Sequence, residues 1–406
     1  MSVGKPSIPS PSGFIWTPLS DIARLESGHT PSRRHAEYWD GDVPWIGIKD
    51  ATGNHGRVIT STLQTITQDG LDNSSARLLP AGTVCLSRTA SVGYVVTMGV
   101  PMATSQDFIN WVCGPQISSR YLHYILVMEQ DSVRRFAHGT THQTVYYPEA
   151  KAFHVCIPSR GEQDRIVSVL GSLDDKIAVN ERIATAARQL GLTLFARSSL
   201  AGDLAQVDVA SVSNVLTRGV APKYSESCES LVVLNQKCIR DGRVNLGPAR
   251  RTLREKVKAP KLLHRNDVLV NSTGVGTLGR VALWTSDDAA TVDSHITIVR
   301  FDEARVDPVC AGFALLRAQP EIEAMGEGST GQTELRRAQL GGLEITLPNR
   351  TRQQQLRPKL EALEEQADQA LAETLTLAAL RDILLPQLMS GRLRVKDAEK
   401  IVEDRT

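Results

Sequence analysis

Residues 136–166 read FAHGTTHQTVYYPEAKAFHVCIPSRGEQDRI, and residues 325–356 read MGEGSTGQTELRRAQLGGLEITLPNRTRQQQL. Both stretches carry Gly, then Thr or Ser, then Thr, one intervening residue and Gln-Thr. About fifteen residues later, each has an apolar run that ends in proline, at Pro158 and Pro348, followed by a helix start that contains glutamine. Self-similarity at a fixed distance indicates that one structural unit occurs twice.

Two further pairs of segments agree with this duplication. Residues 78–95 align with 262–281, and residues 18–28 parallel 208–219, with an offset that stays between about 184 and 190. A module of about 190 residues therefore occurs twice. Each copy begins with short β-rich runs broken by Gly, Pro, Asn and Asp, with short helical patterns among them, which predicts a mixed α/β module. A long helix then follows each module.

Apolar residues recur every three or four positions in both long helices. Neither helix could bury such a stripe alone, so we predict that the two pair with each other; separate packing of each helix on its own module is the alternative. Pro358 is expected to kink or delay the second helix, and Gly191 to weaken the end of the first. About 37 residues at a rise of 1.5 Å make each helix roughly 55 Å long. The stripes comprise Ile166, Leu170, Leu173, Ile177, Ala184, Ala187 and Leu194 in the first helix, and Leu356, Leu360, Leu363, Ala367, Ala370, Leu377 and Leu384 in the second.

The segment VNSTGVGTLGRVALW (270–284) matches the G-x-G-x-x-G pattern of a dinucleotide-binding loop. In that loop the third glycine opens a helix, whereas Gly279 precedes a strand-like run, and the first module keeps only Gly93 of the glycines. The pattern therefore predicts a tight exposed turn between strands, and a nucleotide-cofactor enzyme using residues 274–279 is a minor alternative. The polar side chains expected to point outward from this turn are Asn271, Ser272, Thr273 and Thr277.

Composition argues against a catalytic or secreted chain. Lys and Arg number 46 against 45 Asp and Glu, so any nucleic-acid surface must be local. The sequence contains no phosphate loop, no H-E-x-x-H zinc helix and no N/D-P-P-Y/F methyltransferase motif, and Asp174–Lys176 is expected on a solvated helix face. Neither a metal site nor a cofactor site is predicted. Six cysteines without C-x-x-C spacing, no signal peptide and no long apolar run predict reduced thiols in a cytosolic protein.

One segment, residues 234–267, departs from the even charge balance. It holds ten Lys or Arg against three Asp or Glu, with asparagine and glutamine interleaved. Phosphate contacts need such a local excess, and Arg, Asn and Gln can read base edges, although a solvated charge run is the alternative. The equivalent residues 45–77 are neutral and rich in polar side chains, so the two modules are expected to share a scaffold and differ in their reading surfaces.

The order and duplication of these features resemble the specificity subunit of a Type I restriction–modification system. The ending LRDILLPQLMSGRLRV (380–395) is similar to the C-terminal segment of that family, and the resemblance covers roughly residues 14–396. It implies a non-catalytic chain whose two α/β (α+β) target recognition domains each bind half of a bipartite double-stranded DNA sequence. It also implies that the long helices form an antiparallel coiled coil and dock two modification subunits, which use S-adenosylmethionine. The resemblance further implies two restriction subunits that use ATP and Mg, and a location in the cytoplasm of a prokaryote.

The predicted boundaries are 14–160 and 200–350 for the recognition domains, and 161–199 and 351–396 for the helices with the C-terminal segment. A coiled-coil adaptor that does not read DNA is the alternative function, and a purely structural turn is an equal alternative for the repeated Thr-rich loops. The predicted DNA-contacting residues are Lys49, Arg88, Thr89, Ser91, Thr140, Thr141, Gln143, Thr144, Lys237, Arg240, Arg243, Arg250, Arg251, Arg254, Asn271, Ser272, Thr273, Thr277, Ser329, Thr330, Gln332 and Thr333. Those assigned to the subunit-contact helices are Ile166, Leu170, Leu173, Ile177, Leu356, Leu360, Leu363 and Leu377.

Overall fold

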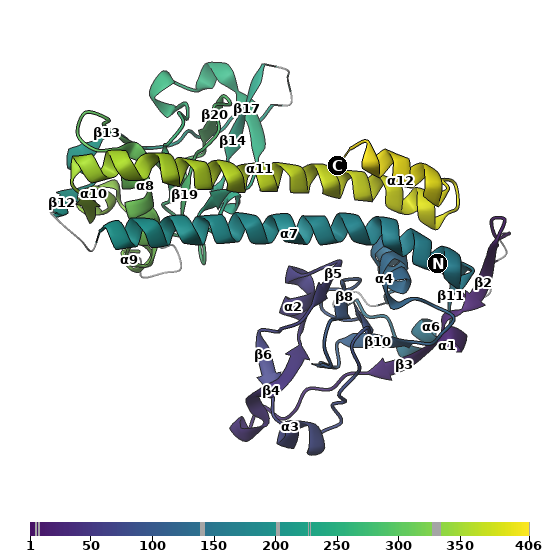
Figure 1. Cartoon of the computed structure of the whole chain (residues 1–406). Helices are drawn as coiled ribbons and strands as arrows, with labels where there is room; N and C mark the ends of the chain where they lie inside the picture. Colours follow the sequence, from purple (N-terminus) through teal and green to yellow (C-terminus); the bar gives the residue numbers. More distant parts are fainter. Residues whose placement is uncertain are drawn as a thin grey trace. The chain divides into compact units, whose positions relative to one another are not determined.

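The computed structural model describes residues 1–4, 6, 9–138, 143–199, 204–225, 227, 229–326 and 334–405. The chain forms two compact units, Met1–Ile177 with Leu375–Thr406, and Ala178–Thr374. Each unit contains one mixed α/β module and part of two long helices, α7 (Arg160–Ser198) and α11 (Arg350–Met389) (Figure 1). We call residues 1–158 module 1 and residues 204–348 module 2. The predicted fold class is confirmed, and each helix begins within one residue of its predicted start.

Module 1 is built on a mainly antiparallel five-stranded sheet. Its order is β3-β10-β7-β8-β5, in which only β5 pairs in parallel. The strands β7 and β8 are buried along their whole length, and α4 and the long helices cover one face of them. A second, smaller sheet of the module has the order β6-β4-β9. The bounds are β1 (Ser2–Val3), β2 (Phe14–Pro18), α1 (Leu19–Ile22), β3 (Ala23–Ser27), β4 (Trp39–Ile46), α2 (Ile48–Gly53), β5 (Arg57–Ile59), β6 (Gln64–Ile66), α3 (Gln68–Asp72), β7 (Val84–Ser87), β8 (Val95–Met98), β9 (Ala103–Thr104), β10 (Phe108–Cys113), α4 (Ser119–Met128), α5 (Gln130–Arg135), α6 (Tyr147–Lys151) and β11 (Phe153–Pro158).

Module 2 repeats this arrangement with four strands in its central sheet instead of five. The sheet β13-β21-β18-β19 matches β3-β10-β7-β8, and β17-β14-β20 matches β6-β4-β9. Equivalent backbone bonds close the two central hairpins: Gly93 N–H donates to Ser87 O at 2.9 Å, and Gly279 N–H donates to Asn271 O at 2.8 Å. The bounds are β12 (Leu204–Asp208), β13 (Ser213–Arg218), β14 (Ser230–Leu234), β15 (Ile239–Arg240), β16 (Arg243–Val244), β17 (Arg250–Leu253), β18 (Val268–Asn271), β19 (Val281–Leu283), β20 (Ala290–Val292), β21 (Ile296–Phe301), α8 (Pro308–Arg317), α9 (Gln319–Ala324), α10 (Arg337–Gly341) and β22 (Glu344–Pro348).

The repeated proline and glutamine join each module to its long helix. The Gln163 side chain is buried; its Nε2 donates to Pro158 O at 3.1 Å, and its Oε1 accepts from Ser118 N–H at 3.0 Å. Gln353 makes the same two bonds, at 2.7 Å to the proline that ends β22 and at 2.8 Å to the residue that caps α8. One amide side chain thus satisfies a strand end and a helix start together, which explains why the pattern occurs in both copies.

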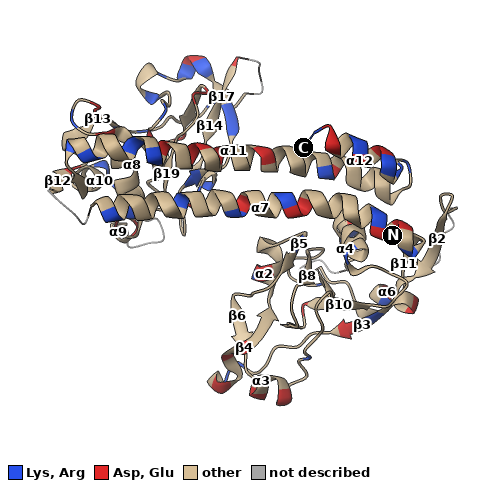
Figure 2. Cartoon of the chain, in the orientation of Figure 1, with Lys and Arg blue, Asp and Glu red and all other residues tan. Residues whose placement is uncertain are grey.

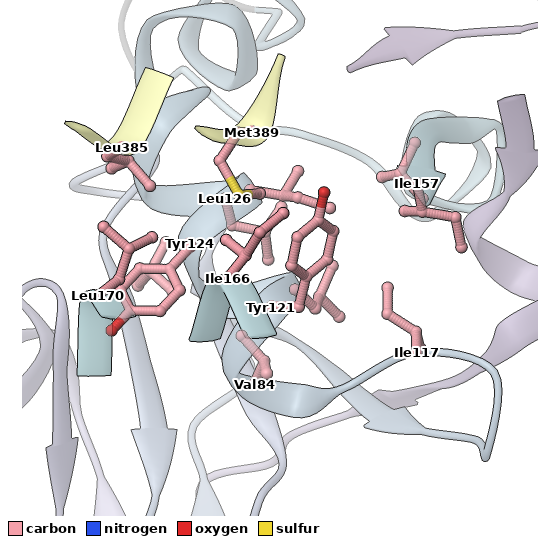
Figure 3. Close-up of a cluster of buried hydrophobic side chains, with 14 of the residues drawn as sticks. Val84, Ile117, Tyr121, Tyr124, Leu126, Ile157, Ile166, Leu170, Leu385 and Met389 are labelled. Carbon is pink, nitrogen blue, oxygen red and sulfur yellow. The ribbon is translucent and has the colours of Figure 1, made fainter. Parts of the chain in front are cut away.

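In the first unit, α7 and α11 pack together against module 1. Ile166 and Leu170 of α7 and Leu385 and Met389 of α11 share one buried cluster with residues of α4, including Tyr121 (Figure 3). The helices therefore pair with each other and also cover the module, so both of the packing modes considered from the sequence are present. Beyond Met389 the chain forms a further helix, α12 (Val395–Glu403), whose Val395 and Ala398 join the same cluster.

In the second unit the two helices meet through small side chains. Ala184 and Ala187 of α7 pack on Ala367 and Ala370 of α11, and such small residues let helix backbones approach closely. The polar contacts give the direction of the pair. Within the first unit Asp174 contacts Arg381, and within the second Asn180 contacts Glu373 and Arg188 contacts Glu364. The partner number falls as the number on α7 rises, so the helices are antiparallel, as the family resemblance implied.

Pro358 and Gly191 both lie inside the long helices. The expectation that Pro358 delays α11 was wrong, because α11 begins eight residues earlier and continues through it. Gly191 lies within α7, which continues to Ser198, and it allows a close contact, because a Cβ there would lie 2.8 Å from Cε1 of Phe313. No helix in the described part of the chain is long and apolar enough to cross a membrane.

Candidate nucleic-acid interface

The glycine pattern at 274–279 is a turn between antiparallel strands. It connects β18 to β19, which pair through Val270 and Val281, and no helix follows its last glycine. Gly274, Gly276 and Gly279 have φ of +108°, +71° and +80°, which other residues rarely adopt. A pyrophosphate loop needs a helix N-terminus at this place, so the predicted turn is confirmed and the dinucleotide alternative loses its basis.

The prediction that the polar side chains of this turn face outward was wrong for two of them. Asn271 and Ser272 are fully buried. The Asn271 amide donates to Gln236 O at 2.9 Å and to Thr277 O at 3.0 Å, and the Ser272 hydroxyl bonds that of Thr297 at 2.5 Å. Both side chains hold the hairpin in place, because the Asn271 amide nitrogen and the Ser272 hydroxyl make these bonds inside the protein. Neither is available for a base or a phosphate.

In module 1, several loops meet where the strands of the central sheet end. Arg88, directly after β7, donates from Nε to Gln106 O at 3.1 Å and from Nη1 to Val145 O at 3.2 Å. Beside it, the Thr89 hydroxyl donates to Asp107 at 2.5 Å. We call this region the loop edge of module 1, which comprises residues 29–33, 46–49, 88–89, 105–107 and 143–147. Ser105 N–H donates to Ile46 O at 3.0 Å, and this bond joins residues 46–49, which end at Lys49, to the rest of the loop edge.

Sequence reasoning missed several aromatic and arginine side chains that lie at or beside this edge. The Arg33 guanidinium lies 3.7 Å from the ring centre of Trp39 and also donates to Gln64. Arg88 lies 4.9 Å from the ring centre of Tyr147, and its neighbour Tyr146 is half exposed. The sequence did contain a pattern that could have indicated these residues, because aromatic residues lie near basic ones and beside the repeated loop. Such pairs present planar groups on which nucleic-acid bases can stack.

The loop edge of module 2 has the same backbone connections and different side chains. It comprises residues 220–224, 235–237, 272–273, 293–295 and 334–337. Leu335 N–H donates to Ser272 O at 2.9 Å, as Val145 N–H does to Arg88 O in module 1. The Thr273 hydroxyl bonds Nδ1 of His295 at 2.7 Å, in the place of the Thr89–Asp107 pair.

The basic segment 234–267 does not form one continuous surface. Arg243 turns toward the helices and donates to Ala184 O at 2.7 Å, and burial lowers its pKa from the ordinary value. Arg251 is held by Ser230 through bonds of 2.7 and 2.5 Å. Arg243 is therefore corrected from a predicted DNA contact to an internal anchor, whereas Arg251 is exposed and has its guanidinium held by Ser230. Lys and Arg residues are also distributed along the long helices, where acidic residues lie among them (Figure 2). The predicted contacts that remain exposed in this segment are Lys237, Arg240, Arg250, Arg251 and Arg254.

The repeated Thr-rich loops lie mostly outside the described residues. Within the described part, Gln143 is exposed, and Thr144 pairs with His138 through two backbone bonds of 2.9 Å. Lys49 is exposed on α2, and Ser91 is half-buried. The predicted contacts that fall outside the described residues are Thr140, Thr141, Ser329, Thr330, Gln332 and Thr333.

The stripe residues assigned to the subunit-contact helices are buried against other residues of the same chain. Seven of the eight are at most 8% exposed, and Leu363 is partly buried. Other side chains of these helices must therefore meet any partner. Asp174, expected on a solvated face, instead accepts from Tyr124 at 2.5 Å and from Arg381 at 2.9 Å. Exposed apolar residues of α11 include Leu375 and Ile383, at 71% and 59% exposure.

Comparison with known proteins agrees with this arrangement. Residues 11–188 match the family described as Type I restriction modification DNA specificity domain. Over 179 residues the chain is 31% identical to the Type I restriction enzyme MjaIX specificity subunit of Methanocaldococcus jannaschii, covering 44% of this chain and 41% of that protein. Over 167 residues it is 28% identical to the EcoR124I/EcoR124II specificity subunit of Escherichia coli, covering 39% and 40%. The match thus spans about two fifths of the length of these curated relatives.

Among solved structures, the fold is similar to that of the Type-I restriction-modification system S subunit from M. genitalium. The TM-score is 0.59 at 15% sequence identity, and the comparison covers 92% of this chain and 96% of that one. At this identity the likeness establishes a shared fold. The chain is thus similar to Type I restriction–modification specificity subunits in sequence over residues 11–188 and in fold over most of its length.

Proposed function

We propose that this chain reads a bipartite DNA target, with one half-site for each module, and has no catalytic residues of its own. The observation that carries the proposal is the comparison of the two loop edges. Thr89 bonds Asp107 in module 1, whereas Thr273 bonds His295 in module 2, on the same backbone connections. A carboxylate only accepts hydrogen bonds, whereas an imidazole can also donate one. Two matched scaffolds with different polar groups are what two half-sites of different sequence require.

Exposed cations of module 2 supply the attraction to the DNA backbone in this proposal. Arg250 lies 4.8 Å from the ring centre of Tyr224, and both side chains are exposed. The chain as a whole has a net charge of only +1, so the attraction depends on where such cations are placed. Substituting Arg250 and Arg254 by alanine should weaken binding to duplex DNA and make its salt dependence shallower.

The partners belong to the same proposal. The paired helices α7 and α11 space the two half-sites and dock two modification subunits, which bind S-adenosylmethionine and methylate adenine. Two restriction subunits, which use ATP and Mg, complete the complex. Leu375 and Ile383 support docking on α11, because large apolar side chains that are exposed in one chain often become buried in a complex.

A methylome tests the proposal. The chain is co-expressed with the modification subunit encoded beside it, in a host that lacks adenine methylation, and the DNA is sequenced for modified bases. A split motif with a fixed gap, absent when either gene is omitted, is expected. Stable association without methylation would favour the adaptor alternative, and methylation by this chain alone would show that it contains an active site.

Single substitutions then assign the half-sites. Thr273→Val should relax or abolish recognition in one half of the motif only, and Thr89→Val should affect only the other half. Thr185→Val is the matched control, because Thr185 lies on an exposed face of α7 and its hydroxyl bonds only its own helix, at Glu181 O. Loss of both halves from either loop-edge variant would contradict the assignment of one half-site to each module.

A further inference from the structure

A cleft of about 510 Å³ lies in module 2 at the end of β13, beside the start of α10. Four cationic side chains line it, from Arg218, Lys261, Arg336 and Arg337, together with the carboxylate of Glu334. Four positive groups against one negative group leave a local excess of three positive charges. The chain as a whole is close to neutral, so this excess is a property of the place and not of the composition.

Two of the cations are held in position by the protein. Arg218 donates from Nη2 to Leu335 O at 3.0 Å and pairs with Glu334 at 2.6 Å. Lys261 donates from Nζ to Gly219 O at 2.6 Å, and an ammonium group has three N–H donors. Both side chains are half-buried, whereas Arg336 and Arg337 are exposed at the outer side. An anion that enters the cleft therefore meets two half-buried cations and two exposed ones.

The cleft belongs to the loop edge of module 2. Leu335, which accepts from Arg218, donates its own N–H to Ser272 O at the end of the central hairpin. Thr273, the next residue, carries the His295 contact that the proposed function assigns to reading. A phosphate in the cleft would thus lie close to bases contacted from the same edge. A backbone phosphate is also a better match for arginine and lysine donors than a base edge, because the phosphate group carries a negative charge and a base edge does not.

Module 1 has different chemistry at the equivalent place. The backbone bonds that align Leu335 with Val145 place Tyr146 and Tyr147 where module 2 has the two exposed arginines. Arg77, the counterpart of Lys261 in the aligned segments, is paired with Glu26 at 2.6 Å. The cationic cleft is therefore a feature of one module and not of the shared scaffold.

We propose that this cleft binds a phosphate of the DNA backbone beside the half-site read by module 2. The inference rests on the proposed function and adds to it a defined backbone contact on one side of the target. It also implies an asymmetry. Module 2 holds its half-site partly through a phosphate clamp, whereas the tyrosines of module 1 offer aromatic surface at the same position.

The test measures binding of the full chain to a fluorescein-labelled DNA duplex as a function of salt. The duplex contains the split motif identified by the methylome, and a second duplex of the same length lacks it. Neutralising one phosphate contributes about 0.9 to the slope of log K against log salt. Arg337→Gln should reduce the slope by about that amount, which corresponds to roughly eightfold weaker binding at about 0.1 M salt if the curves converge near 1 M. Both duplexes should be affected equally.

Arg182→Gln is the matched control, because Arg182 is exposed on α7 and bonds Ala178 O of its own helix. It removes the same charge outside the cleft and should change affinity less than twofold. Arg337→Lys should restore most of the slope. A slope for Arg337→Gln equal to that of Arg182→Gln, with wild-type binding intact, would overturn the cleft inference and leave the proposed function standing. A change in the preferred sequence without a change in slope would mean that the cleft contacts a base. Failure of the wild-type chain to bind either duplex would overturn both the cleft inference and the proposed function.

Discussion

Substituting Arg188 by leucine should strongly destabilise the second unit. Arg188 of α7 and Glu364 of α11 form an ion pair at 2.5 Å, and their side chains are 8% and 6% exposed. Arg188 also donates to Gly242 O in the hairpin between β15 and β16. Burial raises the pKa of Glu364 above its ordinary value of 4.5, and the neighbouring Arg188 opposes that rise. Without Arg188, a carboxylate would remain buried with less compensation, which costs about 3–5 kcal/mol.

Removing both charges separates the cost of an unpaired charge from the loss of packing. In Arg188→Leu with Glu364→Leu, no uncompensated carboxylate remains, so at least half of the lost stability should return. Some loss should persist, because Gly242 O loses a donor and nearby Arg243 loses a counter-charge. Arg240→Leu is the matched control: Arg240 lies on the same hairpin, its pair with Asp241 is exposed at 3.5 Å, and its removal should cost less than about 1 kcal/mol.

The assay is urea unfolding followed by fluorine NMR on 5-fluorotryptophan protein. Trp284 is the only tryptophan among residues 178–374 and is buried, whereas Trp111 reports the first unit. Arg188→Leu should lower the midpoint of the Trp284 signal more than that of Trp111. Its cost should also shrink as the pH falls through the raised pKa of Glu364 toward 4.5, because the protonated side chain carries no charge. A cost below about 1 kcal/mol, a double variant as unstable as the single one, or a cost independent of pH would refute this reasoning.

Three further outcomes are expected. His123 bonds the Thr97 hydroxyl at 2.8 Å, and burial lowers the pKa of its imidazole to about 4. The stability that depends on a neutral imidazole is therefore complete above a pH of about 6.5 and is lost as the pH falls toward 4. His123→Gln should remove up to about 3 kcal/mol of that pH dependence in unfolding measurements. Gly191→Ala should lower the thermal midpoint although alanine favours helices, because its Cβ would lie 2.8 Å from a ring carbon of Phe313. Gln353→Leu should cost about 2–4 kcal/mol by leaving two buried backbone groups unpaired, and hydrogen exchange should show faster opening at the start of α11.

The duplication and the helix pairing could be predicted from the sequence because the same residues recur at the same spacing. The Pro158–Gln163 and Pro348–Gln353 patterns predict a strand end and a helix start, and the structure gives them one physical cause in the glutamine bonds. The antiparallel direction could not be derived from the apolar stripe itself, because a stripe of spacing three and four suits either direction. It depends on which distant residues meet, such as Asp174 and Arg381.

The candidate interface was predicted less well, for a related reason. A polar residue at the end of a strand can face solvent or be buried against a hydrogen-bond partner. Asn271 is buried, and Gln236 O, distant in sequence, accepts a bond from its amide. Arg240 and Arg243 are three residues apart on one hairpin, yet one is exposed and the other bonds Ala184 of α7. Charge counts along the sequence cannot separate such cases, since they contain no information on which side of the hairpin packs against the helices.

Some positions are identical in the two modules and others differ, and the two kinds of position have different roles in the fold. Where the side chain or its absence forms the scaffold, both copies carry the same residue: a Cβ at Gly28 would lie 2.0 Å from Ser105 O, and one at Gly219 would lie 2.0 Å from Val292 O. Where backbone groups alone form the scaffold, the side chain is unconstrained by folding. Asp107 and His295 both accept a backbone hydrogen bond through their carbonyl oxygens, and this bond is the same for any residue. A module built in this way can change the side chains at its loop edge without changing the hairpin that carries them, because these backbone hydrogen bonds do not pass through those side chains.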